Sequence, residues 1–257
     1  LIGKDIAAAY KITDKSARSN ALNEARAKAK VAFADATPQD QMAANKLMKK
    51  LEAEIVRGAI LKDILARVEK HAFQIDRRNG SVVLPDFLAD EKVLLGKGSY
   101  QMGVGGLHST HDKCCFYEAD AELELADFDV TSYYPNVMLN AGITPRGLGQ
   151  EFIVLYRDIL RQRIKEKRAG NTILANSYKI TLNATFGKLG SMFSKLYSPD
   201  LMLAVTLSGQ FYLLALIEDL VTYGVEIVSA NTDGVCLCGT PENVAKARAW
   251  IECYGFL

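Results

Sequence analysis

Two aspartates that lie far apart in the chain, Asp129 and Asp233, have the surroundings of metal ligands. Asp129 belongs to the segment DFDVTSYYP at residues 127–135, and Asp233 belongs to SANTDGV at residues 229–235. Magnesium binds carboxylate, phosphate and water oxygens, so two aspartates on adjacent strands suffice when a substrate supplies the other ligands. Two such ions serve nucleotidyl transfer, because one activates a 3′-hydroxyl and the other holds the triphosphate and leaving group. We therefore predict a site for two Mg²⁺ ions, for which Mn²⁺ can substitute.

The strands that carry the two aspartates follow from the local pattern. Alternation along the first strand puts Phe128 and Val130 on one face and Asp127 and Asp129 on the other, so periodicity alone does not choose between the two aspartates. After residue 225 the pattern predicts a strand, a tight turn at 231–234 and a returning strand. Asp233 is therefore expected on a hairpin turn.

A third segment, KITLNATFG at residues 179–187, belongs to a predicted pair of helices. The helical patterns at 151–168 and 172–187 are joined by a three-residue turn, which predicts an antiparallel hairpin. Arg163 lies seven residues before Gly170 and Lys179 nine residues after it, so at about 1.5 Å per residue the two cations lie at nearly the same height. Two cations at one level predict a clamp for a triphosphate.

The three segments, in this order, resemble the palm and fingers of a family B DNA-directed DNA polymerase of viral or phage type. This resemblance implies template-directed DNA synthesis from dNTPs onto a primer 3′-hydroxyl, with primer-template DNA as the partner. It implies that Asp129, which lies five residues before the tyrosine of Tyr134-Pro135, is the first metal ligand, assisted by the Val130 carbonyl, and that Asp233 is the second. Asp127 is then a solvated or outer carboxylate.

The same resemblance implies roles in nucleotide and template binding. Tyr134 is expected to lie beneath the incoming sugar and to exclude a 2′-hydroxyl. The residues expected to bind the nucleotide are Tyr134, Ser132, Tyr133, Arg163, Lys167, Lys179 and Asn183, and those expected at the template or nascent pair are Phe186, Gly187, Gly105 and Gly106. The sequence departs from the family pattern where Phe186 replaces a tyrosine, Asn231 replaces an aspartate and Gly103 replaces an aromatic residue.

The expected fold class is α+β, with an antiparallel palm sheet, a helical-hairpin fingers insertion and a helical N-terminal region. The expected segments are a helical region at 1–80, the first part of the palm at 81–149, the fingers hairpin at 150–187 and the second part of the palm at 188–257. Within the first segment we expect a helix over 42–69, and the segment shows no obvious chemistry. The apolar stretch at 201–217 is interrupted by polar residues, so a buried helix is expected rather than a membrane span.

Composition adds weaker constraints. The formal net charge is +1, but residues 81–130 are acidic and the flanking segments are more basic. The five cysteines are odd in number and unpatterned, which favours a reducing compartment, and we expect a cytoplasmic protein with no membrane partner. His108, His111, Cys114 and Cys115 are close in sequence but lack the ligand spacing of a structural zinc site.

Alternatives remain open for several of these assignments. The chain ends soon after Asp233, so we expect exonuclease and thumb segments to lie on a separate chain or segment. The alternative to an active polymerase is a catalytically silent nucleic-acid-binding subunit or the remnant of a split polymerase. Tyr134 also fits an ordinary core tyrosine, and the basic run at 161–168 also fits a solvated helix face.

Overall fold

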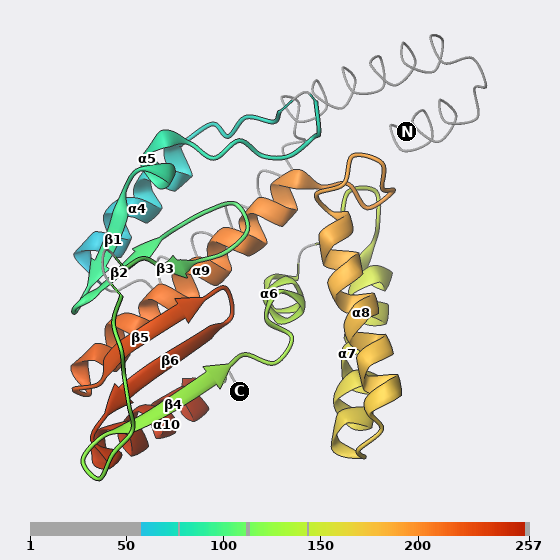
Figure 1. Ribbon diagram of the computed structural model, residues 1–257. Helices are drawn as coiled ribbons and strands as arrows, with labels where there is room; N and C mark the ends of the chain where they lie inside the picture. The colour runs from blue at the N-terminus through green and yellow to red at the C-terminus, as the bar shows by residue number, and fades with distance from the viewer. Residues whose placement is uncertain (1–57, 77, 112–113, 143, 255–257) are drawn as a thin grey trace. The chain divides into compact units, whose positions relative to one another are not determined.

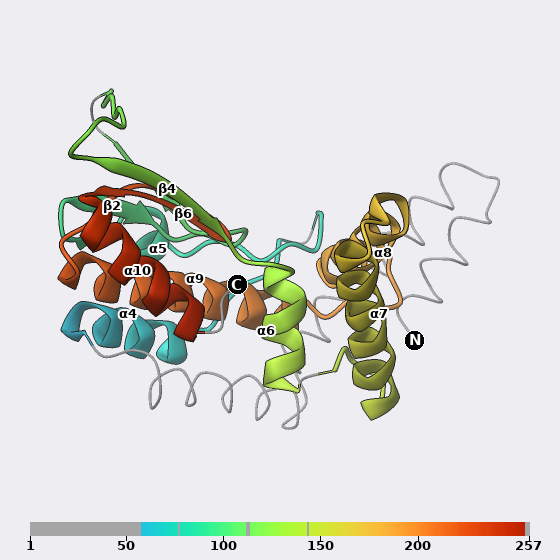
Figure 2. The ribbon, with the colours of Figure 1, turned by 90° about the horizontal axis from the view of Figure 1, so that it is seen from below.

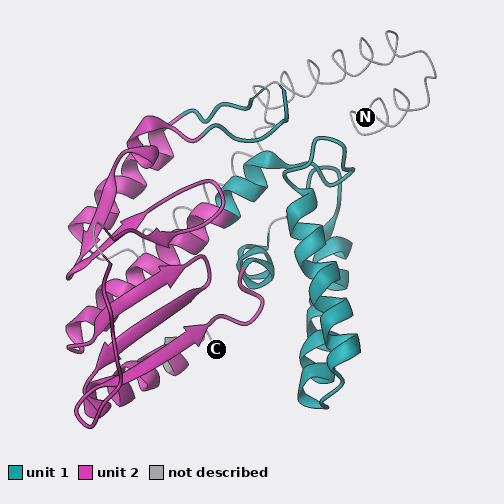
Figure 3. Ribbon diagram, in the orientation of Figure 1, with its two compact units in different colours: residues 1–47, 72–83, 134–205 teal, residues 48–71, 84–133, 206–257 magenta. Residues whose placement is uncertain are grey.

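The described part of the chain is an α+β structure with an antiparallel sheet. The computed structural model describes residues 58–76, 78–111, 114–142 and 144–254. These residues form two compact units, which are coloured separately in Figure 3. Unit 1 contains described residues 72–83 and 134–205, and unit 2 contains 58–71, 84–133 and 206–254. Each unit is considered by itself.

Unit 2 is built around a six-stranded sheet. The strands are β1 (Lys92–Leu95), β2 (Gly98–Gln101), β3 (His108–Ser109), β4 (Glu124–Asp129), β5 (Glu226–Asn231) and β6 (Gly234–Gly239). Their order in the sheet is β1-β2-β3-β5-β6-β4, and each neighbouring pair is antiparallel. Strand β4 therefore lies at one edge of the sheet, where it pairs with β6 of the β5–β6 hairpin (Figure 1).

Helices cover one face of this sheet, as Figure 2 shows. They are α4 (Ala59–Lys70), α10 (Pro241–Tyr254) and the part of α9 (Pro199–Thr222) that belongs to unit 2. Phe128, Val235 and Leu237 of the strands and Leu213, Leu216 and Ile251 of the helices are buried. A further short helix, α5 (Asp86–Ala89), precedes β1.

Helix α9 is the apolar helix expected from the sequence. It is the one helix among the described residues that is long and apolar enough to cross a membrane by length and composition, and 83% of its most apolar window is buried. Its polar residues Thr206, Ser208 and Gln210 are themselves buried. The burial agrees with the expectation of a core helix.

Unit 1 contains a helical hairpin. Helix α7 (Gln150–Arg168) and helix α8 (Thr172–Lys188) are joined by a turn in which Gly170 has φ +76°, and the Asn171 side chain accepts a hydrogen bond from Leu174 N at the start of α8. The Tyr156 hydroxyl of α7 donates to the Leu182 carbonyl of α8 at 2.9 Å. The helices and the turn agree with the sequence pattern. Helix α6 (Tyr133–Ala141) precedes this hairpin in the chain.

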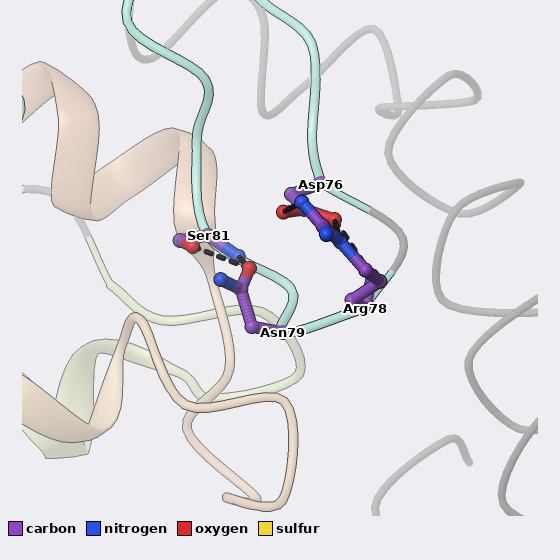
Figure 4. Close-up of polar contacts among 4 residues, drawn as sticks. All are labelled: Asp76, Arg78, Asn79 and Ser81. Atoms are coloured by element: carbon purple, nitrogen blue, oxygen red, sulfur yellow. Dashed lines mark hydrogen bonds and ion pairs between the residues drawn. The ribbon is translucent and has the colours of Figure 1, made fainter.

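Polar contacts among residues 76 and 78–81 also belong to unit 1 (Figure 4). Arg78 donates to Asp76 from its backbone N at 2.8 Å and from its guanidinium at 3.1 Å, and Ser81 N donates to Asn79 Oδ1 at 2.9 Å. Gly80 has φ +73° and accepts a hydrogen bond from the Tyr197 hydroxyl at 2.8 Å. The turn is thus held by its own side chains and by Tyr197.

One expectation about secondary structure was wrong in the described residues. The helix expected over 42–69 does not run unbroken, because Gly58 is extended (φ −70°, ψ 149°) and α4 begins at Ala59. Gly58 N instead donates to the Glu218 carboxylate at 3.1 Å, and the expected helix before residue 58 lies outside the described residues. Residues 81–85 and 114–123 belong to no named strand, and Val82 forms an isolated bridge with Ile75.

The segment 114–123 is held by hydrogen bonds to two carboxylates, those of Asp120 within it and of Glu226 in β5. Glu226 of β5 accepts hydrogen bonds from Lys97 Nζ at 2.7 Å and from the Tyr117 hydroxyl at 2.8 Å. These bonds, that from Lys97 first, lower the pKa of Glu226 below its ordinary value of 4.5. The bond to Glu226 raises the pKa of Tyr117 to about 12.

We predict that Glu226→Gln lowers the free energy of unfolding at neutral pH by about 1 kcal/mol, because two hydrogen bonds to a charged acceptor become bonds to a neutral one. Since the folded-state pKa of Glu226 is lowered, its contribution is present above about pH 4.5 and is lost as the pH falls through the lowered pKa. Urea denaturation at neutral and acidic pH measures this difference. The control Glu242→Gln removes an exposed partner of Lys246 and is expected to change nothing measurable. A Glu226→Gln effect of equal size at both pH values would contradict the assignment.

Candidate metal and nucleotide site

The sheet register places the two predicted metal ligands on neighbouring strands. Asp129 at the end of β4 pairs with Gly234 at the start of β6, and Asp233 is the residue just before Gly234. Val130 N donates to the Asp233 carbonyl at 2.9 Å, so the two segments remain hydrogen-bonded beyond the end of β4. Asp129 and Asp233 also border a small apolar pocket on the covered face of the sheet, whose walls include Leu213 of α9 and Ile251 of α10.

Burial of alternate residues decides which face of β4 carries the carboxylates. Ala126 and Phe128 are buried, whereas Asp127 and Asp129 are exposed on the other face, as the alternation predicts. The Arg248 guanidinium of α10 lies 5.1 Å from the centre of the Phe128 ring, which adds a cation–π contact on the covered face. Asp129 is thus held at the sheet surface by the anchoring of its neighbour.

The hairpin turn that presents Asp233 has a strained backbone. Thr232 has φ 57°, a region in which a β-branched residue is a genuine outlier. Its N–H donates to the Leu107 carbonyl at 2.7 Å, and its hydroxyl donates to Asn231 Oδ1 at 3.1 Å. The other described non-glycine residue with positive φ, Ser132, lies three residues after Asp129. Strain of this kind clusters at functional sites, so its position beside both aspartates supports a site here.

The glycines at 105 and 106 have different surroundings. A Cβ on Gly106 would lie 2.7 Å from Thr232 Oγ1, so this glycine lets the loop pack against the strained turn. A Cβ on Gly105 would meet nothing within 4 Å. The expected approach of both glycines to a template strand stays a prediction, but the structure gives Gly106 a structural role.

Gln210 is a supporting residue that the sequence reasoning missed. This buried side chain of α9 donates from Nε2 to the Gly103 carbonyl at 2.6 Å and accepts from Gly103 N at 2.8 Å. It therefore fixes the start of the loop that carries Gly106. The available signal was an amide in the middle of a long apolar helix, since a buried amide needs partners.

The described ligand set suits a hard cation that keeps part of its water shell. Among the described residues, no group of three or more His, Cys, Asp or Glu side chains could hold a metal ion. Asp129, Asp233 and the Val130 carbonyl supply oxygens only, which fits Mg²⁺ bound through one or two carboxylates with water and phosphate completing the shell.

Ser132 and Tyr133 belong to unit 2 with the carboxylates. Both are buried, and the Tyr133 hydroxyl donates to the Gly209 carbonyl of α9. The backbone amides of these residues follow directly after the carboxylate strand. Their predicted contact with a triphosphate stays a prediction.

The remaining predicted nucleotide-binding residues belong to unit 1. Tyr134 and Phe186 stack on each other, with ring centroids 4.5 Å apart and planes 20° apart. Arg163 is buried with 8% of its surface exposed, whereas Lys179 is exposed on the facing helix. Four of the predicted site residues in unit 1 are exposed: Lys167, Lys179, Asn183 and Gly187. The two cations of the predicted clamp therefore have different environments, and the clamp itself stays a prediction.

Comparison with known proteins gives a family match at the N-terminal end. Residues 1–68 match the family model described as polyribonucleotide nucleotidyltransferase, RNA binding domain. A polyribonucleotide nucleotidyltransferase of Rhizorhabdus wittichii is 86% identical over 63 residues, which is 24% of this chain and 8% of the relative. That of Novosphingobium aromaticivorans is 78% identical over 63 residues, with the same two shares. That of Sphingopyxis alaskensis is 45% identical over 152 residues, which is 58% of this chain and 18% of the relative.

These matches overturn the functional expectation drawn from the three motif segments. The relatives are named for nucleotidyl transfer on polyribonucleotides, and the matched domain is an RNA-binding domain. The expected family B DNA polymerase, its DNA synthesis from dNTPs and its primer-template DNA partner are therefore wrong. The physical reason is that a carboxylate pair on adjacent strands is a general metal-binding geometry, which does not specify a DNA substrate.

The family match lies before the carboxylate site in the chain. The chain spans 8% to 18% of the length of these three relatives. The family match ends at residue 68, before β4 begins at Glu124, and among its residues the structure describes 58–68, which include most of α4. The roles of Asp129 and Asp233 therefore rest on their geometry.

The strained turn gives a testable prediction. We expect Thr232→Gly to be more stable than Thr232→Val by about 1 kcal/mol, because both lose the hydroxyl but only glycine adopts φ 57° without strain. At an ordinary strand position the order is the reverse, since valine favours strands. Chemical denaturation of the two variants measures the difference, and a more stable valine variant would show that the turn is unstrained.

Proposed function

We propose that this chain is part of an RNA-acting nucleotidyltransferase, in which Asp129 and Asp233 hold the divalent metal. The observation that carries the proposal is the match of residues 1–68 to an RNA-binding domain of polyribonucleotide nucleotidyltransferases. The polyribonucleotide is the proposed substrate, in agreement with the names of the relatives. A divalent metal bound by the two carboxylates would stabilise the charge on the phosphate during nucleotidyl transfer.

The arrangement of unit 2 supports the second part of the proposal. The β4–β6 register brings Asp129 and Asp233 to the same end of the sheet, where Val130 N donates to the Asp233 carbonyl. When bound there, Mg²⁺ or Mn²⁺ supplies charge stabilisation for the phosphate and its leaving group. Buried Phe128 fixes the position of Asp129, and the hydrogen-bonded turn at Thr232 fixes that of Asp233.

The RNA-binding part of the proposal is tested by fluorescence anisotropy. The full chain is titrated against a labelled oligoribonucleotide and the oligodeoxyribonucleotide of the same sequence at one salt concentration. We expect tighter binding to RNA, because 2′-hydroxyl contacts distinguish RNA from DNA. Equal binding to the two strands, or no binding to either, would refute the proposed substrate.

The metal part is tested by Mn²⁺ titration and by nucleotidyl transfer to or from the labelled oligoribonucleotide. We predict that Asp129→Asn or Asp233→Asn weakens Mn²⁺ binding at least about tenfold and abolishes transfer, because each removes a charged ligand. Asp127→Asn is the matched control, since Asp127 lies on the same exposed face of β4 two residues away. An equal loss in the Asp127→Asn variant would show a general charge effect instead of a specific site.

A further inference from the structure

Helix α7 carries a row of exposed cations that the carboxylate site does not use. Arg157, Arg161, Lys165 and Arg168 are all exposed, and we call them the α7 basic stripe. They are separated by four, four and three residues, so they lie along one side of the helix. The buried residues of α7, which include Tyr156 and Leu160, lie on another side.

The carboxylates of α7 do not neutralise the stripe. Asp158 contacts Arg161 at 3.5 Å, but both side chains are more than half exposed, so this pair contributes little. The other acidic residues of the helix, Glu151 and Glu166, have helical positions away from the line of the stripe. The stripe therefore retains a net positive charge.

The helix dipole explains only part of the stripe. Lys165 and Arg168 lie in the last turn of α7, where cations stabilise the helix end. Arg157 and Arg161 lie in the middle of the helix, where the dipole has no end to stabilise. Two guanidinium groups remain without this explanation, and guanidinium is the side chain that best matches phosphate in bidentate hydrogen bonds.

The spacing of the stripe fits a nucleic-acid backbone. Arg157, Arg161 and Lys165 follow one another at about 6 Å along the helix axis, a distance on the scale of one nucleotide in an extended strand. A membrane surface fits the stripe less well, because Ile153, Tyr156 and Leu160 are buried, and the exposed apolar residues of α7, Val154 and Leu155, precede the stripe, which begins at Arg157.

We propose that the α7 basic stripe binds the phosphate backbone of a single-stranded polyribonucleotide. The inference rests on the proposed function, in that it takes RNA as the substrate, and it adds a contact surface outside the family match at residues 1–68. Such contacts position a strand without reading its sequence.

The test is the salt dependence of oligoribonucleotide binding by the full chain. The stripe variant carries Arg157→Gln, Arg161→Gln, Lys165→Gln and Arg168→Gln. Each phosphate contact on a single strand contributes about 0.7 to the magnitude of the slope of log K against log salt. Loss of four such contacts is therefore expected to lower this magnitude by about 2.8. The double variant Arg161→Gln/Lys165→Gln is expected to lose about half of that.

The matched control is Lys188→Gln/Lys195→Gln, which removes two exposed charges of unit 1 outside the stripe. A smaller slope for the Arg161→Gln/Lys165→Gln variant with an unchanged slope for the control supports the proposal. An equal loss of slope in the Arg161→Gln/Lys165→Gln variant and in the control would overturn the proposal, because it would show a general charge effect. Competition gives a second check: if polyglutamate displaces the labelled RNA as effectively as unlabelled RNA does, the proposal is also overturned. Binding of RNA with an unchanged slope in the stripe variant refutes the stripe alone, whereas no RNA binding by the wild-type chain refutes the proposed function. Circular dichroism confirms that the variants are folded.

Discussion

The antiparallel pairing of β4 with β6 is the constraint on which the carboxylate site depends. Phe128 pairs with Val235 and both are buried under the helices, so burial fixes the register of the two strands. A slip of one residue would turn Asp129 toward the covered face and Phe128 toward solvent, at the cost of an unpaired buried charge. The position of the metal ligands is therefore set by the packing of their apolar neighbours.

A second set of contacts links α9 to the turn that contains Asp233. The buried amide of Gln210 holds Gly103 through two hydrogen bonds, and the loop that follows accepts the Thr232 N–H at Leu107. Gly106 gives this loop room to pack against Thr232. The strained φ of Thr232 is thus maintained by contacts on both sides, and the amide of Gln210 explains why a polar residue is kept inside an otherwise apolar helix.

Local patterns in the sequence predicted much of the fold, and long-range contacts account for what they missed. The α7–α8 hairpin follows from helical periodicity with Gly170 at its turn, and the exposed face of Asp127 and Asp129 follows from strand alternation. The burial of Arg163 and the start of α4 after Gly58 could not be predicted from local patterns. Arg163 sits in a run that looks solvated, and Gly58 is held by Glu218, far away in the sequence.

The substrate could not be derived from the carboxylates because metal ligands do not distinguish RNA from DNA. That distinction requires contact with the 2′-hydroxyl or its exclusion. Exclusion was the role predicted for Tyr134, and it presupposed a deoxyribonucleotide, so the correction of the substrate removes its basis. One face of the Tyr134 ring is covered by Phe186, which gives this tyrosine a packing role in unit 1. The finding that supports the proposed substrate is instead the match of residues 1–68, whose alanine- and lysine-rich sequence shows no obvious chemistry by itself, to an RNA-binding domain.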